Sequence, residues 1–263
     1  MKVIFVLAIF ITGCISTPVR VENLPEQKLI DNPQQLELQK RSINTLITDA
    51  DKCYLKHTVS SLHKSIHLAQ EVIKKDAHYS GAYWRTSRAY HSLYDLIDND
   101  EKKDLYALEG IKYAQQGMQA NSKSPECLYY QAVCLGLYSQ LHPITSLGRI
   151  RQMIESGKQA VEIDGSIFYG GPHRLLGYIY LQAPESLGFG DLDLALEHFE
   201  QALEIAPNHA GNLVAMAQAH IEDDSLEEAK KLLKEVLSRE NFDDIPHALE
   251  QSKKEAKKLL SSL

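Results

Sequence analysis

Residues 191–241 read DLDLALEHFEQALEIAPNHAGNLVAMAQAHIEDDSLEEAKKLLKEVLSREN. One spacing occurs twice within this stretch. Intervals of four, three and five residues separate Ala195, Phe199, Ala202 and Pro207. The same intervals, thirty-four residues later, separate Ala229, Leu233, Val236 and Asn241. A fixed period of this kind indicates a repeat architecture, in which each unit is one supersecondary motif that packs on its neighbours.

The order of residue types within the period is small, bulky, small and helix-breaking. It resembles the second helix of the tetratricopeptide (TPR) repeat, whose period is about 34 residues. The preceding first helices agree with this resemblance, since their signature positions hold Leu176, Gly177 and Tyr180 in one unit and Leu213, Met216, Ala217 and His220 in the next. The resemblance implies an all-α fold, a TPR-like superhelical solenoid of helix-turn-helix repeats with terminal capping helices.

The same phase continues towards the N-terminus and predicts five units within residues 34–263, with about 11 or 12 helices and no strands. The helices over about 34–56 and 246–260 are predicted to be caps. Residues 182–190 are predicted to form an enlarged loop between two helices, and Asp191 to cap the second of them. Gly170-Gly171-Pro172 indicates the start of a first helix, with Pro172 in its first turn.

Residues 1–13 have the organisation of a lipoprotein signal peptide. Lys2 precedes an apolar run from Val3 to Ile11, which is shorter than the about 20 residues that a membrane-spanning helix needs. The end of the run, Ile11-Thr12-Gly13-Cys14, resembles the bacterial lipobox. That resemblance implies lipidation of Cys14 and an outer-membrane anchor that faces the periplasm. Residues 14–33 are predicted to be a tether, because the segment after Cys14 is polar, contains three prolines and lacks a helical period. A generic secretory signal and a short membrane-associated N-terminus are the alternatives.

Charge and composition exclude several classes of function. A formal net charge of −7 and a pI near 5.9 argue against a nucleic-acid partner, which requires a basic face. His63 and His67 have the spacing of two metal ligands on a helix, but no acidic third ligand lies nearby in the sequence. Gly188-Phe189-Gly190 lacks the Lys-Ser or Lys-Thr that follows a phosphate-binding loop. We therefore expect no metal, no cofactor and no enzymatic activity.

Three cysteines remain besides Cys14. Cys127 and Cys134 are seven residues apart on one predicted helix, which separates them by about 10 Å along its axis. A disulfide requires Cα atoms within about 7 Å, so these two cannot pair with each other. We interpret them, together with Cys53, as small packing residues.

The candidate binding residues are those that the first helix of a TPR unit turns towards the concave groove. On the phase above they are Trp84, Arg88, His91, Tyr129, Arg174 and Tyr178. An aromatic and basic lining in an acidic protein fits an acidic or carboxylate-bearing ligand, or an extended peptide, because arginine forks onto carboxylates. The alternative is that Trp84 and Tyr178 pack against adjacent helices.

Two narrower resemblances bear on function. Gly170 to Tyr180, followed by Ala183-Pro184 and Gly190-Asp191, resembles a group of TPR lipoproteins described as T components of TRAP-type solute transporters. The segment from Cys134 to Asp164 resembles the TPR-like regulators of microtubule dynamics. The leading hypothesis is an envelope-anchored scaffold that binds a protein or peptide partner through its groove. The alternative is a transport subunit that binds a small hydrophobic carboxylate and a solute-binding protein.

Changing Cys14→Ser is expected to move the protein from the membrane fraction to the soluble fraction of a bacterial host, because the acyl chains supply the anchoring energy. Incorporation of labelled palmitate should be lost at the same time. Cys53→Ser serves as the control and should leave both properties intact. Retention of the Cys14→Ser chain in the membrane pellet would contradict the lipobox interpretation.

Overall fold

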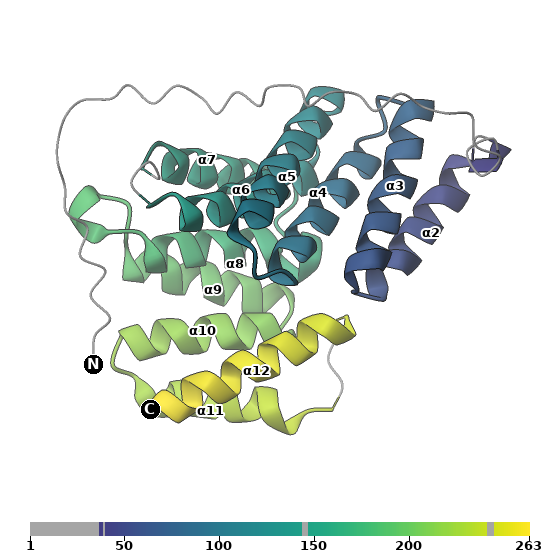
Figure 1. Ribbon diagram of the computed structural model, residues 1–263. Helices are drawn as coiled ribbons and strands as arrows, with labels where there is room; N and C mark the ends of the chain where they lie inside the picture. The colour runs from purple at the N-terminus through teal and green to yellow at the C-terminus, as the bar shows by residue number, and fades with distance from the viewer. Residues whose placement is uncertain (1–36, 39, 144–146, 241–244) are drawn as a thin grey trace.

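The computed structural model describes residues 37–263, apart from residues 39, 144–146 and 241–244. Cys14 and the predicted signal and tether lie outside the described residues. All eleven α-helices of the described chain are shown in Figure 1, and no strand occurs among these residues. The helices are α2 (Ile43–Leu55), α3 (Val59–Lys75), α4 (Ser80–Asp95), α5 (Asp100–Ala120), α6 (Pro125–Leu141), α7 (Leu147–Asp164), α8 (Ile167–Gln182), α9 (Leu192–Ile205), α10 (Ala210–Glu222), α11 (Leu226–Ser238) and α12 (Pro246–Ser262).

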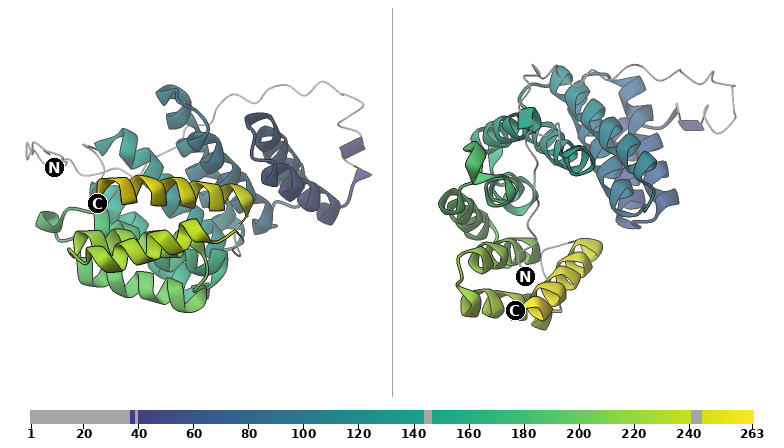
Figure 2. Two further views of the ribbon diagram at one scale, coloured as in Figure 1. Left: turned by 90° about the horizontal axis from the view of Figure 1, so that it is seen from below. Right: turned by 60° about the vertical axis from the view of Figure 1, so that its left-hand side comes forward.

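These helices form five consecutive pairs, from α2–α3 to α10–α11, followed by α12. The pairs follow a curve, and α12 lies across its concave side (Figure 2). The prediction of an all-α solenoid is therefore confirmed. One detail differs from expectation: α2 begins at Ile43 and pairs with α3 rather than standing alone as a cap.

Helix starts follow the local chemistry of the sequence. Polar side chains at six N-cap positions accept a hydrogen bond from the backbone N–H three residues on, and so satisfy one of the free donors of the first turn. These residues are Ser42, Thr58, Asn99, Ser124, Asp191 and His209. The cap predicted at Asp191 is thereby confirmed, and the enlarged loop before it contains a short 3-10 helix, Glu185–Leu187.

Small residues let neighbouring helices approach closely. Gly177 on α8 lies against the Phe199 ring on α9, and a Cβ added at Gly177 would overlap that ring. Gly110 and Gly117 on α5 lie in the same way against the sulfur atoms of Cys134 and Cys127 on α6. Both thiols are buried, and burial raises the pKa of Cys127 to about 11 and that of Cys134 to about 12. Cys53, Cys127 and Cys134 are all buried, which agrees with their interpretation as small packing residues.

The start of α8 contains a left-handed turn. Phe168, Tyr169 and Gly170 have φ values of 51°, 59° and 77°, and the regular helix begins only after them. Left-handed backbone costs a residue with a side chain about 1–2 kcal/mol, so two aromatic residues in this conformation must be held by their surroundings. Pro172 follows in the first regular turn, which agrees with the position predicted for it.

The N-terminal end of α12 reaches back to the first helix pair. Ile245 packs against the apolar cluster that contains Tyr54 and Leu62, and His247 stacks on His57 with ring centroids 3.8 Å apart. The pKa of His247 is lowered to about 4, mainly by burial and in addition by the charges of His57, Arg88 and His91. The pKa of His57 is also lowered, mainly by burial, although Asp95 opposes the shift. We call this contact, made by His57, Ile245 and His247, the end contact.

Lowering the pH from 7 to 5 is expected to reduce the stability of the protein. A histidine in the unfolded chain binds a proton near pH 6.5, whereas folded His247 stays neutral down to about pH 4, so stability is lost as the pH falls through that window. His247→Phe keeps a ring against His57 but removes the titrating group. Urea denaturation at both pH values should show a smaller loss for this variant.

His173 and His198 also have lowered pKa values, caused mainly by burial, and will maintain part of the pH dependence in the variant. The matched control is His67→Phe, at an exposed position on α3, which should keep the full dependence. Equal loss of stability in the wild type and the His247→Phe variant would show that the end contact does not respond to protonation.

Candidate functional site

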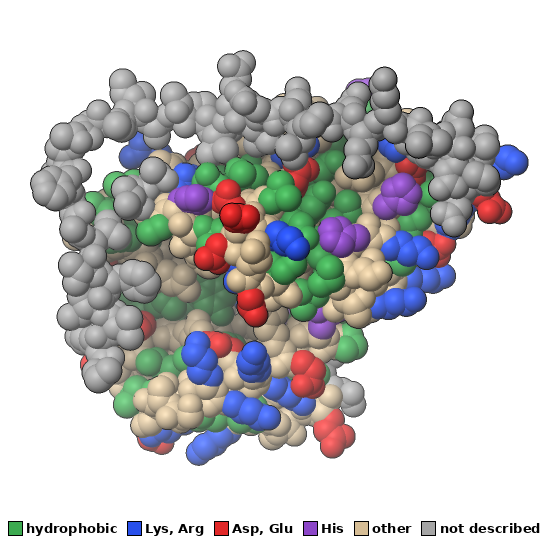
Figure 3. All heavy atoms as spheres, in the orientation of Figure 1, with side chains coloured by type: hydrophobic (Ala, Val, Ile, Leu, Met, Phe, Trp, Pro, Cys, Tyr) green, Lys and Arg blue, Asp and Glu red, His purple; other side chains and the backbone are tan. Residues whose placement is uncertain are grey.

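A cleft of about 890 Å³ lies on the concave side of the solenoid. The first helices of three successive units, α6, α8 and α10, line it together with α7, α12 and the enlarged loop after α8. Its walls are mainly apolar and include Leu137, Ile150, Met153, Leu175, Ile179 and Val214. In Figure 3 a hollow with hydrophobic side chains in its floor opens above α12, and lysine and arginine side chains gather below it. The cleft is large enough for a short peptide segment or one small molecule.

Three of the six predicted binding residues line this cleft. They are His91 on α4 and Arg174 and Tyr178 on α8. Tyr178 packs edge-on against Phe199 at 5.2 Å between ring centroids, so it contacts a neighbouring helix as well as the cleft. Burial raises its pKa to about 12, and the charge of Glu255 adds to this effect while Arg174 opposes it. The hydroxyl is therefore neutral.

Trp84 and Tyr129 belong to an aromatic cluster beside the cleft. Trp84 stacks on Tyr130 and meets Phe168 edge-on, at centroid distances of 6.2 Å and 5.6 Å. Tyr129 contacts the same two rings, at 5.0 Å and 5.2 Å. Because Phe168 belongs to the left-handed turn, the cluster holds that turn against α4 and α6. These contacts agree with the alternative that Trp84 packs against adjacent helices, although its indole ring is only partly buried.

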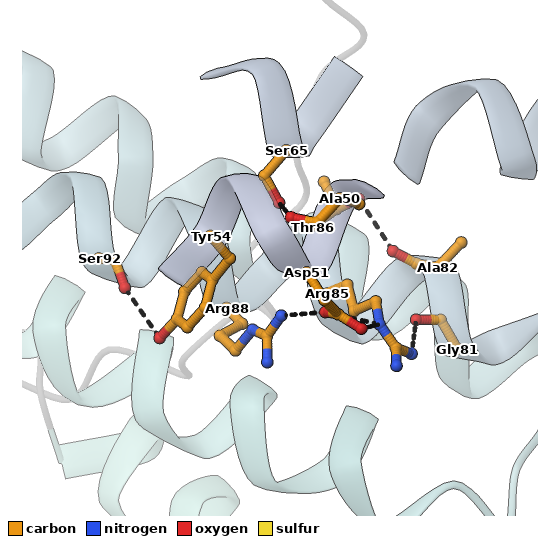
Figure 4. Close-up of polar contacts among 10 residues, drawn as sticks. All are labelled: Ala50, Asp51, Tyr54, Ser65, Gly81, Ala82, Arg85, Thr86, Arg88 and Ser92. Carbon is orange, nitrogen blue, oxygen red and sulfur yellow. Dashed lines mark hydrogen bonds and ion pairs between the residues drawn. The ribbon is translucent and has the colours of Figure 1, made fainter. Parts of the chain in front are cut away.

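Arg88 takes part in an ion-pair network that joins α4 to α2 (Figure 4). Its guanidinium donates to Asp51 at 2.6 Å, and Arg85 donates to both oxygens of the same carboxylate at 3.0 Å. The guanidinium of Arg88 also lies 3.7 Å from the centre of the Tyr54 ring. Only 14% of the Arg88 side chain is exposed, so its main contacts are within the protein.

Several residues of the site had no sequence signal. Asp51 and Tyr54 lie in the least regular unit, and no repeat position indicates their pairing with Arg88. Asn212 on α10 is fully buried and donates to the carbonyl oxygen of Tyr169 at 3.0 Å, which fixes the left-handed turn. The wall formed by α12 contributes Ala248, Gln251, Ser252 and Glu255. Their spacing of three, one and three residues places them on one face of α12. The sequence does not show that this face borders the cleft, because that depends on the curvature of the solenoid.

Other features give no site among the described residues. No group of three or more histidine, cysteine or acidic side chains there could hold a metal ion, and His63 instead contacts the Tyr106 hydroxyl at 3.4 Å. No helix in the described part of the chain is both long and apolar enough to span a bilayer. The lipidation predicted at Cys14 falls outside this part.

Comparison with known families matches two parts of the chain. Residues 46–164 match the family model described as Regulator of microtubule dynamics protein 1-3, and residues 186–252 match a tetratricopeptide repeat model. Regulator of microtubule dynamics protein 2 from Mus musculus is 23% identical over 268 residues, which cover 94% of this chain. The chain spans 62% of the length of that mouse protein.

Solved TPR structures have the same arrangement of helices. A thermophilic TPR protein of Thermus thermophilus superposes with a TM-score of 0.61 at 14% identity, over 83% of this chain and 100% of that one. The pilF protein of Pseudomonas aeruginosa gives a TM-score of 0.52 at 12% identity, over 87% of this chain and 93% of that one. The chain therefore has the TPR fold predicted from its repeat spacing. At these identities the likeness concerns the fold alone.

Replacing Arg88 by Met is expected to reduce the free energy of unfolding by about 1–3 kcal/mol, because the hydrogen bond to Asp51 and the contact with Tyr54 are both lost. A double-mutant cycle with Asp51→Asn, measured by urea denaturation, should give a coupling energy well above that of an exposed pair. Arg151→Met, at an exposed position on α7, is the control and should change stability by less than about 0.5 kcal/mol. No coupling between Arg88 and Asp51 would contradict a structural role for the network.

Proposed function

We propose that the protein is an envelope-anchored TPR scaffold that binds a protein or peptide partner in its concave cleft. The observation that carries the proposal is the cleft itself, which is apolar along its walls and presents His91 from α4 and Arg174 and Tyr178 from α8. The TPR fold supports it, since solenoids of this kind use their concave surface for interaction. Trp84, Arg88 and Tyr129 would form the adjoining wall and keep the groove in shape.

Anchoring through Cys14 would place this cleft at the bacterial outer membrane, facing the periplasm. The support for that part is the lipobox-like sequence at residues 11–14 and the polar segment after it. A partner would then be an envelope protein, or a segment of one that enters the periplasm.

A transport accessory function is a second candidate. In this proposal the protein holds a small hydrophobic carboxylate and docks on a solute-binding protein, as the T component of a TRAP-type transporter. The size of the cleft favours it, because about 890 Å³ is within the usual range of small-ligand pockets. Its predominantly apolar walls with one arginine also fit such a ligand.

Partner binding in the cleft predicts site-specific photocrosslinking. A photoreactive phenylalanine analogue at Gln218, which lines the cleft, should crosslink to one defined partner in the producing cells. The same analogue at Gln201, exposed on α9, should not. Arg174→Gln in the Gln218 background is expected to lower the yield of the crosslink several-fold, because a charge-assisted contact is removed.

Equal crosslinking from Gln218 and Gln201 would contradict binding in the cleft. Native mass spectrometry of the purified protein separates the two candidates. A small acid that co-purifies with the chain and is lost in the Arg174→Gln variant would favour the transport function. A crosslinked polypeptide without such a ligand favours the scaffold.

A further inference from the structure

We propose that the cleft selects ligands by a carboxylate group, which the Arg174 guanidinium binds while the buried amide of Asn212 holds the arginine in position. The ligand would be an apolar molecule or peptide segment that carries this one acidic group. This inference rests on the proposed function, because it concerns the same cleft.

Arg174 is the only lysine or arginine in an otherwise acidic part of the chain. Between Glu162 and Glu228 it is the only lysine or arginine, against thirteen aspartate and glutamate residues. Among the described residues that line the cleft, Arg174 and Glu255 are the only ones of these four types. A ligand that enters the apolar cleft therefore meets one cation, fixed at the junction of α8 and α10.

The partner of Arg174 leaves its charge uncompensated. Four other arginines of the described chain pair with carboxylates: Arg41 with Asp49, Arg85 and Arg88 with Asp51, and Arg239 with Glu235. Arg174 instead donates from Nη1 to the amide oxygen of Asn212 at 2.5 Å and to the carbonyl oxygen of Tyr169 at 3.5 Å. A neutral amide orients the guanidinium without neutralising it. The N–H groups on Nη2 make no hydrogen bond with the described residues and can donate to a carboxylate.

The orientation of Asn212 is determined by its surroundings. Its side chain is fully buried, and the two N–H groups of Nδ2 are shared among the carbonyl oxygens of Ala202, Tyr169 and Ala206, which lie 2.7, 3.0 and 3.2 Å from the nitrogen. Three acceptors on one side require the NH₂ group there, so the amide oxygen must face Arg174. One of those acceptors, the Tyr169 carbonyl, is presented by the left-handed turn. The strained backbone at the start of α8 thus contributes to the position of the arginine.

The rest of the cleft fits the remainder of such a ligand. Leu175, Ile150 and Met153 offer apolar contacts, and Tyr178, whose hydroxyl is neutral, lines the same cleft one turn after Arg174 on α8. Glu255 on α12 lies across the cleft and disfavours a second anionic group. A ligand with one carboxylate and an apolar body satisfies these constraints better than a polyanion.

The test uses the purified full-length chain and two fluorescent probes, dansyl-labelled undecanoic acid and its methyl ester, which differ in charge but hardly in size. The acid is expected to bind at least about tenfold more tightly than the ester at low salt, the range of a charge-assisted hydrogen bond. Arg174→Gln should bring the two affinities together by weakening the acid alone. Glu255→Gln should strengthen binding of the acid alone. Arg151→Gln, which removes the same charge from an exposed position, is the control and should change neither.

Asn212→Asp tests the positioning role, since it places a carboxylate beside Arg174 and should lower the ratio of acid to ester affinity. A melting curve checks that the variant is folded, and if it is not, the ratio in Arg174→Gln decides the test. Equal binding of both probes by the wild type would overturn the inference. So would an absence of binding by either probe, or an unchanged ratio in Arg174→Gln.

Peptides identify the source of the carboxylate. An apolar peptide with a free C-terminus, its C-terminal amide, and the amide with one internal glutamate distinguish a terminal carboxylate from an acidic side chain. If the Gln218 crosslink persists while acid and ester probes bind equally, the scaffold function stands and carboxylate selection fails. If acid selection holds while crosslinking is the same from Gln218 and Gln201, the scaffold function fails and the selective cleft remains.

Discussion

The close approach of consecutive helices, both within a pair and between pairs, is the constraint on which the rest of the structure depends. Where Gly177 faces Phe199, the absence of a side chain lets the bulky ring fill the space between α8 and α9. The same arrangement recurs where Gly110 and Gly117 face cysteine sulfurs across the α5–α6 boundary. Tight packing in successive units sets how each pair rotates on the last, and that rotation produces the concave surface and its cleft. The position of Arg174 relative to α10 and α12 follows from this stacking.

The repeat spacing was sufficient to predict the fold because it reports local packing. Ala195, Phe199 and Ala202 are all fully buried, as their places in the repeat require, and so are Ala229, Leu233 and Val236 one period later. The repeat spacing does not predict tertiary contacts that occur only once in the structure. The predicted groove positions identified His91, Arg174 and Tyr178 as cleft residues but also selected Arg88, whose partner Asp51 lies in the least regular unit. Sequence periodicity shows which side of a helix faces inwards, but not whether an inward arginine already has a carboxylate.

The features that distinguish the cleft come from segments that depart from the regular TPR repeat. The Gly-Gly-Pro sequence marked the start of α8, but the left-handed conformation of the two aromatic residues before it depends on contacts from α4, α6 and α10. The enlarged loop after α8 was visible as an insertion, and in the structure it borders the cleft through Ala183, Pro184 and Leu187. Regular units thus provide the frame, and the irregular fourth unit provides the features that make one part of the concave surface unlike the others.

The end contact also has a consequence for how the protein folds. In an open solenoid each repeat touches only its neighbours, so the terminal units can unfold independently and folding depends on local contacts. Here His57 and His247 touch although about 190 residues separate them in the chain. Closing so large a loop costs entropy and delays its formation until the intervening repeats are in place. Once formed, it couples the two ends, so that loss of structure at either one weakens the other and the array behaves more like a single cooperative unit.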